Sequence, residues 1–126
     1  MELQIFYRYC GVLGLIYLLL TFYVIRMRWK HRVGLGHGKN EHMTKAVRIH
    51  GNYNEYVPFI LMLTYFAIQK NAINLMAIHF LLGGLVLSRI SHFIGLRKSA
   101  GSTIYRMFGT GVIIVALFAI SITLLG

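Results

Sequence analysis

The chain has 126 residues, of which 57% are hydrophobic and only 13% charged, and its 13 Lys and Arg against three acids give a net charge of +10. A typical soluble domain has about 45–50% apolar and about 25% charged residues, so this chain has too few charges to cover a water-exposed surface. The wealth of Leu, Ile, Phe and Tyr excludes a disordered chain, and the single cysteine, Cys10, excludes a disulfide scaffold and zinc sites built on cysteine pairs. The composition predicts one domain, integral to a membrane.

Four uncharged runs divide the chain and cover residues 9–25, 56–69, 71–88 and 107–126. A helix needs about 20 apolar residues to cross a bilayer, so the second run is long enough only if its helix begins upstream, near Thr44. The runs lack the alternation of strands. We therefore predict an all-α integral membrane protein, an up-down bundle of four transmembrane helices over about 3–27, 44–69, 72–95 and 102–125.

The connections fit this arrangement. Glycines and basic residues between 26 and 43 predict a loop, and the tight turn after Lys70 makes the second and third helices antiparallel neighbours. Asn71 is the expected N-cap of the third helix and Ser102 that of the fourth.

The basic residues predict the orientation. Residues 26–48 hold seven Lys and Arg and residues 89–106 hold four, whereas the other side has only Arg8 and Lys70. This asymmetry favours two cytoplasmic loops and both termini outside, in the cytoplasmic membrane if the protein is bacterial. A strong positive charge can also indicate nucleic-acid binding, but bases gathered at the ends of apolar runs are more typical of cytoplasmic loops. We expect a lipid bilayer and no nucleic acid as partner. No cleavable signal pattern is visible, so the first span is expected to remain as an anchor.

Polar residues interrupt the second helix at membrane depth. Arg48, Asn52 and Glu55 are spaced i, i+4, i+7 and share one face, with Tyr56 beside it. Charges at this depth are costly and are functional candidates by default. Arg48 leans toward the helix N-terminus, away from Glu55, so we expect the two not to pair.

The third helix offers a partner. Arg89 and His92, spaced i, i+3, share a face and should lie at a depth similar to that of Glu55. We therefore expect Arg89 to meet Glu55. The structural alternative is a buried polar network that holds the helices together.

Two histidines permit a haem interpretation. His79 and His92 lie 13 residues apart, a separation along a helix at which each could ligate one of two haems. Thirteen residues turn a helix by roughly 220°, however, so the two do not share a face. We expect His79 to be a packed, hydrogen-bonded side chain.

The polar set predicts the kind of ligand. Arginines suit carboxylates, a buried glutamate suits an ammonium group, and an asparagine suits a peptide group. A small zwitterionic peptide with two carboxylates would fit. A pocket at this depth is also open to lipid, so the second substrate is expected to be a lipophilic small molecule.

The segment from Arg48 to Pro58 reads R-x-x-x-N-x-x-E-Y-x-P. It resembles the second-helix motif of the MAPEG family (membrane-associated proteins in eicosanoid and glutathione metabolism), which includes leukotriene C synthase and microsomal glutathione transferases. The segment from Arg89 to His92 is similar to the family's R-x-x-H on helix three, and Arg26-Met-Arg28 to the basic end of its first helix. The resemblance covers nearly the whole chain in length, spans and motif order.

The resemblance implies a homotrimer that binds glutathione, as cosubstrate, between subunits near the cytoplasmic side. It implies a glutathione S-transferase or peroxidase that acts on lipophilic electrophiles through an activated thiolate. Candidate catalytic residues are Tyr105, Ser102 and Arg97. The residues that the resemblance implies for glutathione binding are Arg26, Arg48, Asn52, Glu55, Tyr56, Arg89, His92 and Tyr105.

The chain departs from the eicosanoid synthases at one important position. Those enzymes carry an arginine, implicated in thiol activation, four or five residues before the helix-four tyrosine; here those positions are Gly101 and Ala100. Arg97 and Arg106 are nearby, at unmatched spacings. The family also contains a lipoxygenase-activating protein without transferase activity, so a non-catalytic binding or scaffold protein on the same fold is the alternative. A small cation transporter is disfavoured, because it wants an intramembrane glutamate without fixed cations nearby.

Overall fold

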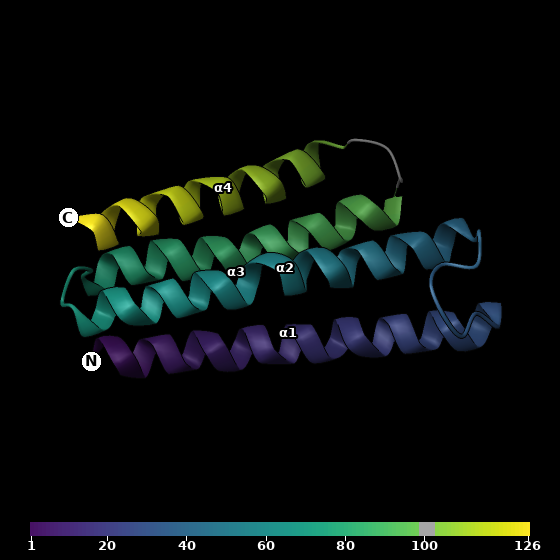
Figure 1. Cartoon of the computed structure of the whole chain (residues 1–126), viewed down its shortest axis with the longest axis horizontal. Coiled ribbons are helices and arrows are strands. Elements are labelled where there is room, and N and C mark those ends of the chain that lie inside the picture. The colour runs from purple at the N-terminus through teal and green to yellow at the C-terminus, as the bar shows by residue number, and fades with distance from the viewer. Residues whose placement is uncertain (99–102) are drawn as a thin grey trace.

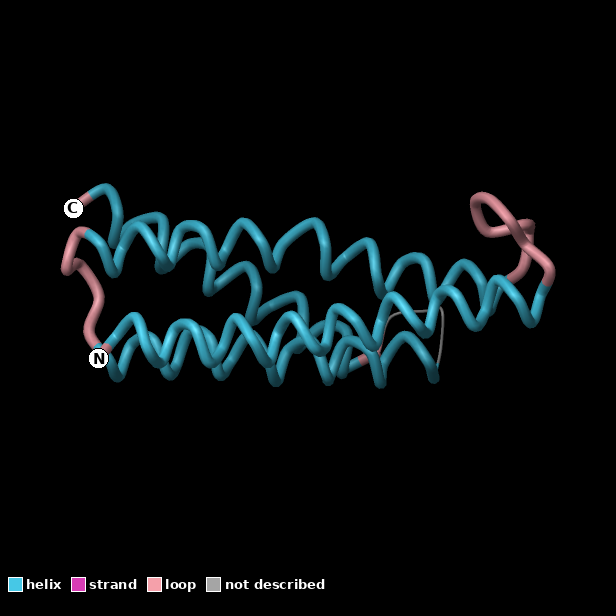
Figure 2. The backbone as a smooth tube through the Cα atoms, turned by 90° about the horizontal axis from the view of Figure 1, so that it is seen from below, coloured by secondary structure: helices cyan, strands magenta, loops and turns pink. Residues whose placement is uncertain are grey.

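The computed structural model describes residues 1–98 and 103–126, which form a bundle of four antiparallel helices (Figure 1). They are α1 (Glu2–His31), α2 (Glu41–Gln69), α3 (Leu75–Lys98) and α4 (Ile104–Leu125). No strand occurs in these two ranges. The α2–α3 turn and both termini lie at one end of the bundle, and the α1–α2 loop lies at the other (Figure 2). The predicted all-α four-helix fold is confirmed.

Three of the helices, α1, α3 and α4, are long and apolar enough to cross a membrane. Helix α2 has 29 residues, about 44 Å at 1.5 Å per residue, and is long enough, but its polar residues distinguish it from the other three. Large apolar side chains cover the outside of the bundle, among them Leu15, Phe22, Phe80 and Phe118. Such a surface is stable in hydrocarbon and not in water, so the chain is a multi-pass helical membrane protein.

Helices α1 and α2 extend beyond α3 and α4 at the end with the α1–α2 loop (Figure 1). Arg28 organises this loop: its Nη1 donates to the carbonyl oxygens of Val33 at 3.3 Å, Gly34 at 3.1 Å and Gly36 at 3.3 Å. Helix α1 ends at His31, and the left-handed backbone of the next residue, Arg32, turns the chain. Arg28 therefore stabilises the α1–α2 loop through these hydrogen bonds.

Two expected helix starts are wrong. Helix α2 begins at Glu41, before Thr44, because the Asn40 side chain accepts a hydrogen bond from Met43 N at 3.0 Å and caps the helix there. Asn71 does not cap α3. It has a φ of 52°, which turns the chain after α2, whereas an N-cap needs an extended backbone. Asn74 takes that role and accepts from Ala77 N at 2.9 Å.

The start of α4 is capped by Thr103, whose side chain accepts from the backbone N–H of Arg106 at 3.3 Å. The expected cap, Ser102, lies outside the described residues, as do Gly101 and Ala100.

An apolar core runs along the bundle axis, with residues such as Leu13, Val57, Ile60, Leu82 and Ile113 fully buried. Two polar features fix how the helices approach each other. Tyr53 on α2 donates its hydroxyl to the carbonyl of Leu13 on α1 at 2.6 Å. Gly109 on α4 lies so close to α3 that a Cβ there would come within 2.8 Å of the Ser88 carbonyl oxygen. The close crossing at Gly109 brings polar side chains of α2, α3 and α4 into one region.

Candidate functional site

A small polar cavity lies between α2, α3 and α4, toward the end of the bundle with the α1–α2 loop. We call it the polar pocket. It holds about 170 Å³, and its lining residues are Thr44, Lys45, Arg48, Asn52, His92, Leu96, Arg106 and Thr110. Three of them are cations, and no carboxylate occurs among the described residues that line it. The pocket is therefore suited to an anionic group.

Helix periodicity explains the lining. Each helix contributes residues spaced four apart, which lie one above the other on a single face. The sets are Thr44, Arg48 and Asn52 on α2, His92 and Leu96 on α3, and Arg106 and Thr110 on α4. Lys45 joins the α2 set because it is spaced i, i+3 from Arg48.

Arg89 lies directly behind the pocket and is only 4% exposed. Its Nη1 donates to Asn52 Oδ1 at 2.5 Å, its Nη2 to the Gly109 carbonyl at 3.0 Å, and its Nε to Ser88 Oγ at 3.2 Å. One guanidinium thus joins three helices. Because arginine can only donate, the oxygen of the Asn52 amide must face it, which leaves the Asn52 NH₂ group to donate elsewhere.

The expected separation of Arg48 and Glu55 is wrong. Arg48 Nη1 lies 3.5 Å from Glu55 Oε1, and the two side chains are 60% and 50% exposed. Both project from the bundle surface, where the long arginine side chain can span two helical turns. The sequence has only three acids. Glu2 and Glu41 lie in the first turns of α1 and α2, so Glu55 is the one acid within the length of a helix.

The expected contact between Glu55 and Arg89 is also wrong. Arg89 points into the bundle and is bonded to Asn52, Ser88 and Gly109, whereas Glu55 points outward and pairs with Arg48. Glu55 on α2 and Arg89 on α3 lie at similar depths along the bundle. The two helices are rotated about their axes so that the two side chains point in different directions.

The Arg48–Glu55 pair lies deep along the bundle. Arg89 is nine residues before Lys98, so its contact with Asn52 lies about 13 Å from that end of α3, and Glu55 is three residues further along α2. An exposed ion pair at this depth is costly against hydrocarbon.

The remaining predicted site residues lie at different distances from the pocket. Tyr56 is half-buried against the core on the turn after Asn52. Tyr105 is exposed, with the Lys98 ammonium 4.7 Å above its ring, and is not among the residues that line the pocket. Arg97 lies over the ring of Phe93 at 5.4 Å.

Arg26 is exposed on α1, also outside the lining, and Ser102 lies outside the described residues. Within one chain the pocket brings together Arg48, Asn52 and His92, with Arg89 behind them.

Four polar residues of the lining were not predicted as ligands: Thr44, Lys45, Arg106 and Thr110. Spacing could have identified Lys45 and Thr44, which precede Arg48 by three and four residues. Lys45 Nζ also lies 2.7 Å from Glu41 Oε1. This hydrogen bond and the lysine charge hold the pKa of Glu41 below its usual range.

The histidines form no metal site in the described residues, which contain no group of three or more His, Cys, Asp or Glu side chains. His79 Nδ1 lies 3.0 Å from the Tyr9 hydroxyl, and His50 Nε2 lies 3.2 Å from Thr21 Oγ1. Both contacts join neighbouring helices.

Comparisons with known proteins agree with this architecture. A sequence profile described as the MAPEG family matches residues 6–126. Inner membrane protein YecN of Escherichia coli strain K12 is 31% identical over 87 residues, which are 69% of this chain and 66% of the relative. YecN of Escherichia coli O6:H1 strain CFT073 matches with the same values, so the chain spans 66% of the length of these relatives. No solved structure gave a significant match.

Proposed function

Because the chain belongs to the MAPEG family, we propose that it binds glutathione through the polar pocket and uses it as a cosubstrate. The observation that carries the proposal is the pocket lining, in which Lys45, Arg48 and Arg106 surround a cavity without a carboxylate among its described lining residues. Glutathione is a peptide with two carboxylates and one ammonium group. Arginine and the Asn52 amide are suitable donors to such a carboxylate.

The pocket size defines how much of the peptide it takes. A cavity of 170 Å³ is several times the roughly 30 Å³ of a water molecule, enough for one carboxylate end and too small for a whole tripeptide. The rest of the ligand would extend along α2 past Arg48 to Glu55. The half-exposed carboxylate of Glu55 suits the ammonium group. Tyr56 would lie beside it.

We propose a homotrimer as the working unit. The Arg48–Glu55 pair faces outward at membrane depth, and Arg26 is exposed on α1, away from the pocket of its own chain. A neighbouring copy would cover the pair and complete the site, which would remove the cost of an ion pair exposed to lipid. With both basic loops in the cytoplasm and both termini outside, the polar pocket opens near the cytoplasmic side.

The chemistry follows from the charge. A thiol pKa of about 8.5 falls beside cations, so a glutathione sulfur held near Arg48 and Arg106 would gain thiolate character. The thiolate would attack a carbon of a lipophilic electrophile to form a C–S bond, while the thiol proton passes to water and the leaving group departs with its electron pair. Against a lipid hydroperoxide, the sulfur would take the terminal oxygen as the O–O bond breaks, which leaves a sulfenic acid and releases the lipid alcohol with the thiol proton. A second glutathione would then attack the sulfenic sulfur to form the disulfide and release water.

A specific observation favours the alternative, a non-catalytic binding or scaffold protein. Tyr105, the counterpart of the helix-four tyrosine, lies outside the pocket lining under the Lys98 ammonium. Turnover separates the two functions. The purified protein would be assayed for conjugation of glutathione to an aryl halide and for glutathione-dependent reduction of cumene hydroperoxide. Arg48→Gln is the test variant, and Arg8→Gln, which changes an exposed arginine outside the pocket lining, is the control.

Turnover that Arg48→Gln lowers at least tenfold and Arg8→Gln leaves unchanged is the expected result. Saturable glutathione binding without turnover would establish the scaffold alternative, and the absence of both would overturn the proposal.

A further inference from the structure

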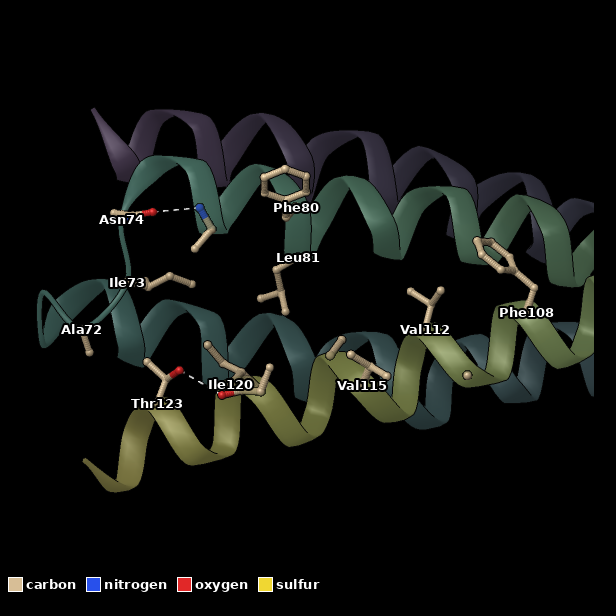
Figure 3. Close-up of a pocket in the computed structure, with 14 residues that line it drawn as sticks. Ala72, Ile73, Asn74, Phe80, Leu81, Phe108, Val112, Val115, Ile120 and Thr123 are labelled. Atoms are coloured by element: carbon tan, nitrogen blue, oxygen red, sulfur yellow. Dashed lines mark hydrogen bonds between the residues drawn. The ribbon is translucent and has the colours of Figure 1, made fainter.

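We propose that an apolar groove between α3 and α4 holds an acyl chain of a phospholipid, with Lys70 at its mouth to contact the phosphate. The groove holds about 760 Å³ and runs from the α2–α3 turn along α4 as far as Phe108 (Figure 3). Its residues come from that turn, from the start of α3, and from α4 between Phe108 and Thr123.

At Gly109 the backbone of α4 lies close to the Ser88 carbonyl oxygen of α3. Beyond it the helices are separated by side chains that point into the space between them, including Leu81, Val112 and Ile120 (Figure 3). Ile120 is buried and forms part of the floor, whereas Phe80 on α3 is 77% exposed and stands at the wall.

The described lining of the groove is mostly apolar. Asn74 and Thr123 carry the polar groups of the lining. Asn74 Oδ1 accepts from Ala77 N, and Thr123 Oγ1 donates to the Ala119 carbonyl, both within their own helices. The groove lies between two helices that are apolar enough to cross the membrane. A hydrocarbon chain is therefore the chemistry that it accepts.

The groove follows much of the length of α4. From Phe108 to Thr123 it runs 15 residues, about 22 Å of the roughly 30 Å hydrocarbon core. An extended acyl chain is thin and enters a groove of this length from the bilayer without displacing protein.

Lys70 provides the second, independent feature. Its Nζ donates to the carbonyl of Leu124 at 3.1 Å, and Leu124 directly follows Thr123, the last lining residue of α4. An ammonium has three donors, so two remain for other acceptors. The Glu2 carboxylate lines a separate polar hollow with Asn71 and Ala72. A cation above an apolar groove matches a phospholipid, with its phosphate above its acyl chains.

Photocrosslinking tests the proposal in the full-length protein. The protein would be reconstituted in vesicles of phosphatidylglycerol and phosphatidylethanolamine with a small fraction of phosphatidylglycerol that carries a photoreactive acyl chain, and adducts would be mapped by peptide mass spectrometry. Ala119→Phe fills the groove, and Ile122→Phe, exposed on the same helix outside the lining, is the matched control. Lys70→Gln removes the cation, and Arg8→Gln is its control.

The expected result is saturable labelling concentrated on groove residues, reduced at least fivefold by Ala119→Phe, at least threefold by Lys70→Gln, and by neither control. If Ala119→Phe fails to fold by circular dichroism, Val115→Phe serves as the second filling variant. Labelling spread evenly over the bundle surface would mean bulk lipid only and would overturn the proposal. Efficient disulfide crosslinking between copies of Val115→Cys in a Cys10→Ser background would mean that a second copy occupies the groove, and would overturn it as well.

Discussion

Arg89 Nη1 on α3 donates to Asn52 Oδ1 on α2 over 2.5 Å, and both side chains belong to the motifs by which the sequence resembles its family. The same guanidinium holds the Gly109 carbonyl of α4. Arg89 therefore has a structural role within one chain, and it also fixes which atoms of Asn52 can reach a ligand. The same hydrogen bonds of Arg89 therefore hold the helices together and orient Asn52 toward the polar pocket.

Replacing Arg89 by Met should destabilise the bundle. The variant leaves the Asn52 oxygen and the Gly109 carbonyl without their partner in a buried position, which costs about 1–3 kcal/mol. Thermal unfolding in detergent, followed by circular dichroism, measures the loss. Arg97→Met is the control, since Arg97 lies over the face of Phe93 and its loss should cost less than about 1 kcal/mol. Equal stabilities for the two variants would contradict the proposed role of Arg89.

The helix crossing at Gly109 predicts a contrast between two glycines on α4. A Cβ at Gly109 would lie 2.8 Å from the Ser88 carbonyl oxygen and 3.0 Å from His92 Cβ, whereas one at Gly111 would meet nothing within 4 Å. Gly109→Ala should therefore destabilise the bundle by about 1–3 kcal/mol. Gly111→Ala should leave stability unchanged or raise it by up to about 1 kcal/mol through helix propensity. Unfolding curves of the two variants in the same detergent test this, and a neutral Gly109→Ala would refute the close crossing.

The Arg48–Glu55 pair should matter more for ligand binding than for stability. Both side chains are at least half exposed, and such pairs contribute about 0–1 kcal/mol in a polar environment. A double-mutant cycle of Arg48→Gln and Glu55→Gln in detergent should give a coupling energy for unfolding in that range. The same single variants should weaken glutathione binding at least tenfold. A large coupling energy with unchanged binding would mean that the pair is structural.

The sequence predicted the bundle well because long uncharged runs and basic loop residues are direct consequences of the bilayer. It also identified Arg48, Asn52 and His92, which line the pocket, from their spacing on two helices. It failed on side-chain partners. Glu55 and Arg89 share a depth but not a direction, because helix rotation is set by packing, here by the crossing at Gly109.

Arg106 illustrates the same limit at the other wall of the pocket. Its spacing from Tyr105 matched no family pattern, yet it lines the pocket whereas Tyr105 does not. Only the orientation of α4 decides which of two adjacent residues faces inward. Similarly, the N-cap of α3 is Asn74 and not the predicted Asn71, because Asn71 has a left-handed backbone and lies in the turn before the helix.

The orientation in the membrane gives a further prediction. In a Cys10→Ser background, Leu35→Cys lies in the α1–α2 loop, where Leu35 is 91% exposed, and Asn71→Cys lies in the exposed α2–α3 turn. A membrane-impermeant maleimide added to intact cells or right-side-out vesicles should label Asn71→Cys at once and Leu35→Cys only after permeabilisation. This follows from two basic loops on the cytoplasmic side. The reverse pattern would place the polar pocket near the outer face.

Equilibrium binding of glutathione to the detergent-purified protein tests the central claim most directly. Isothermal titration calorimetry should show saturable binding to the wild type and to Arg97→Gln, and binding at least tenfold weaker for Asn52→Leu, which keeps the side-chain volume but removes the amide. Circular dichroism would verify that each protein is helical. Absence of saturable binding by a well-folded wild type, or equal affinities for all three proteins, would contradict glutathione binding in the polar pocket.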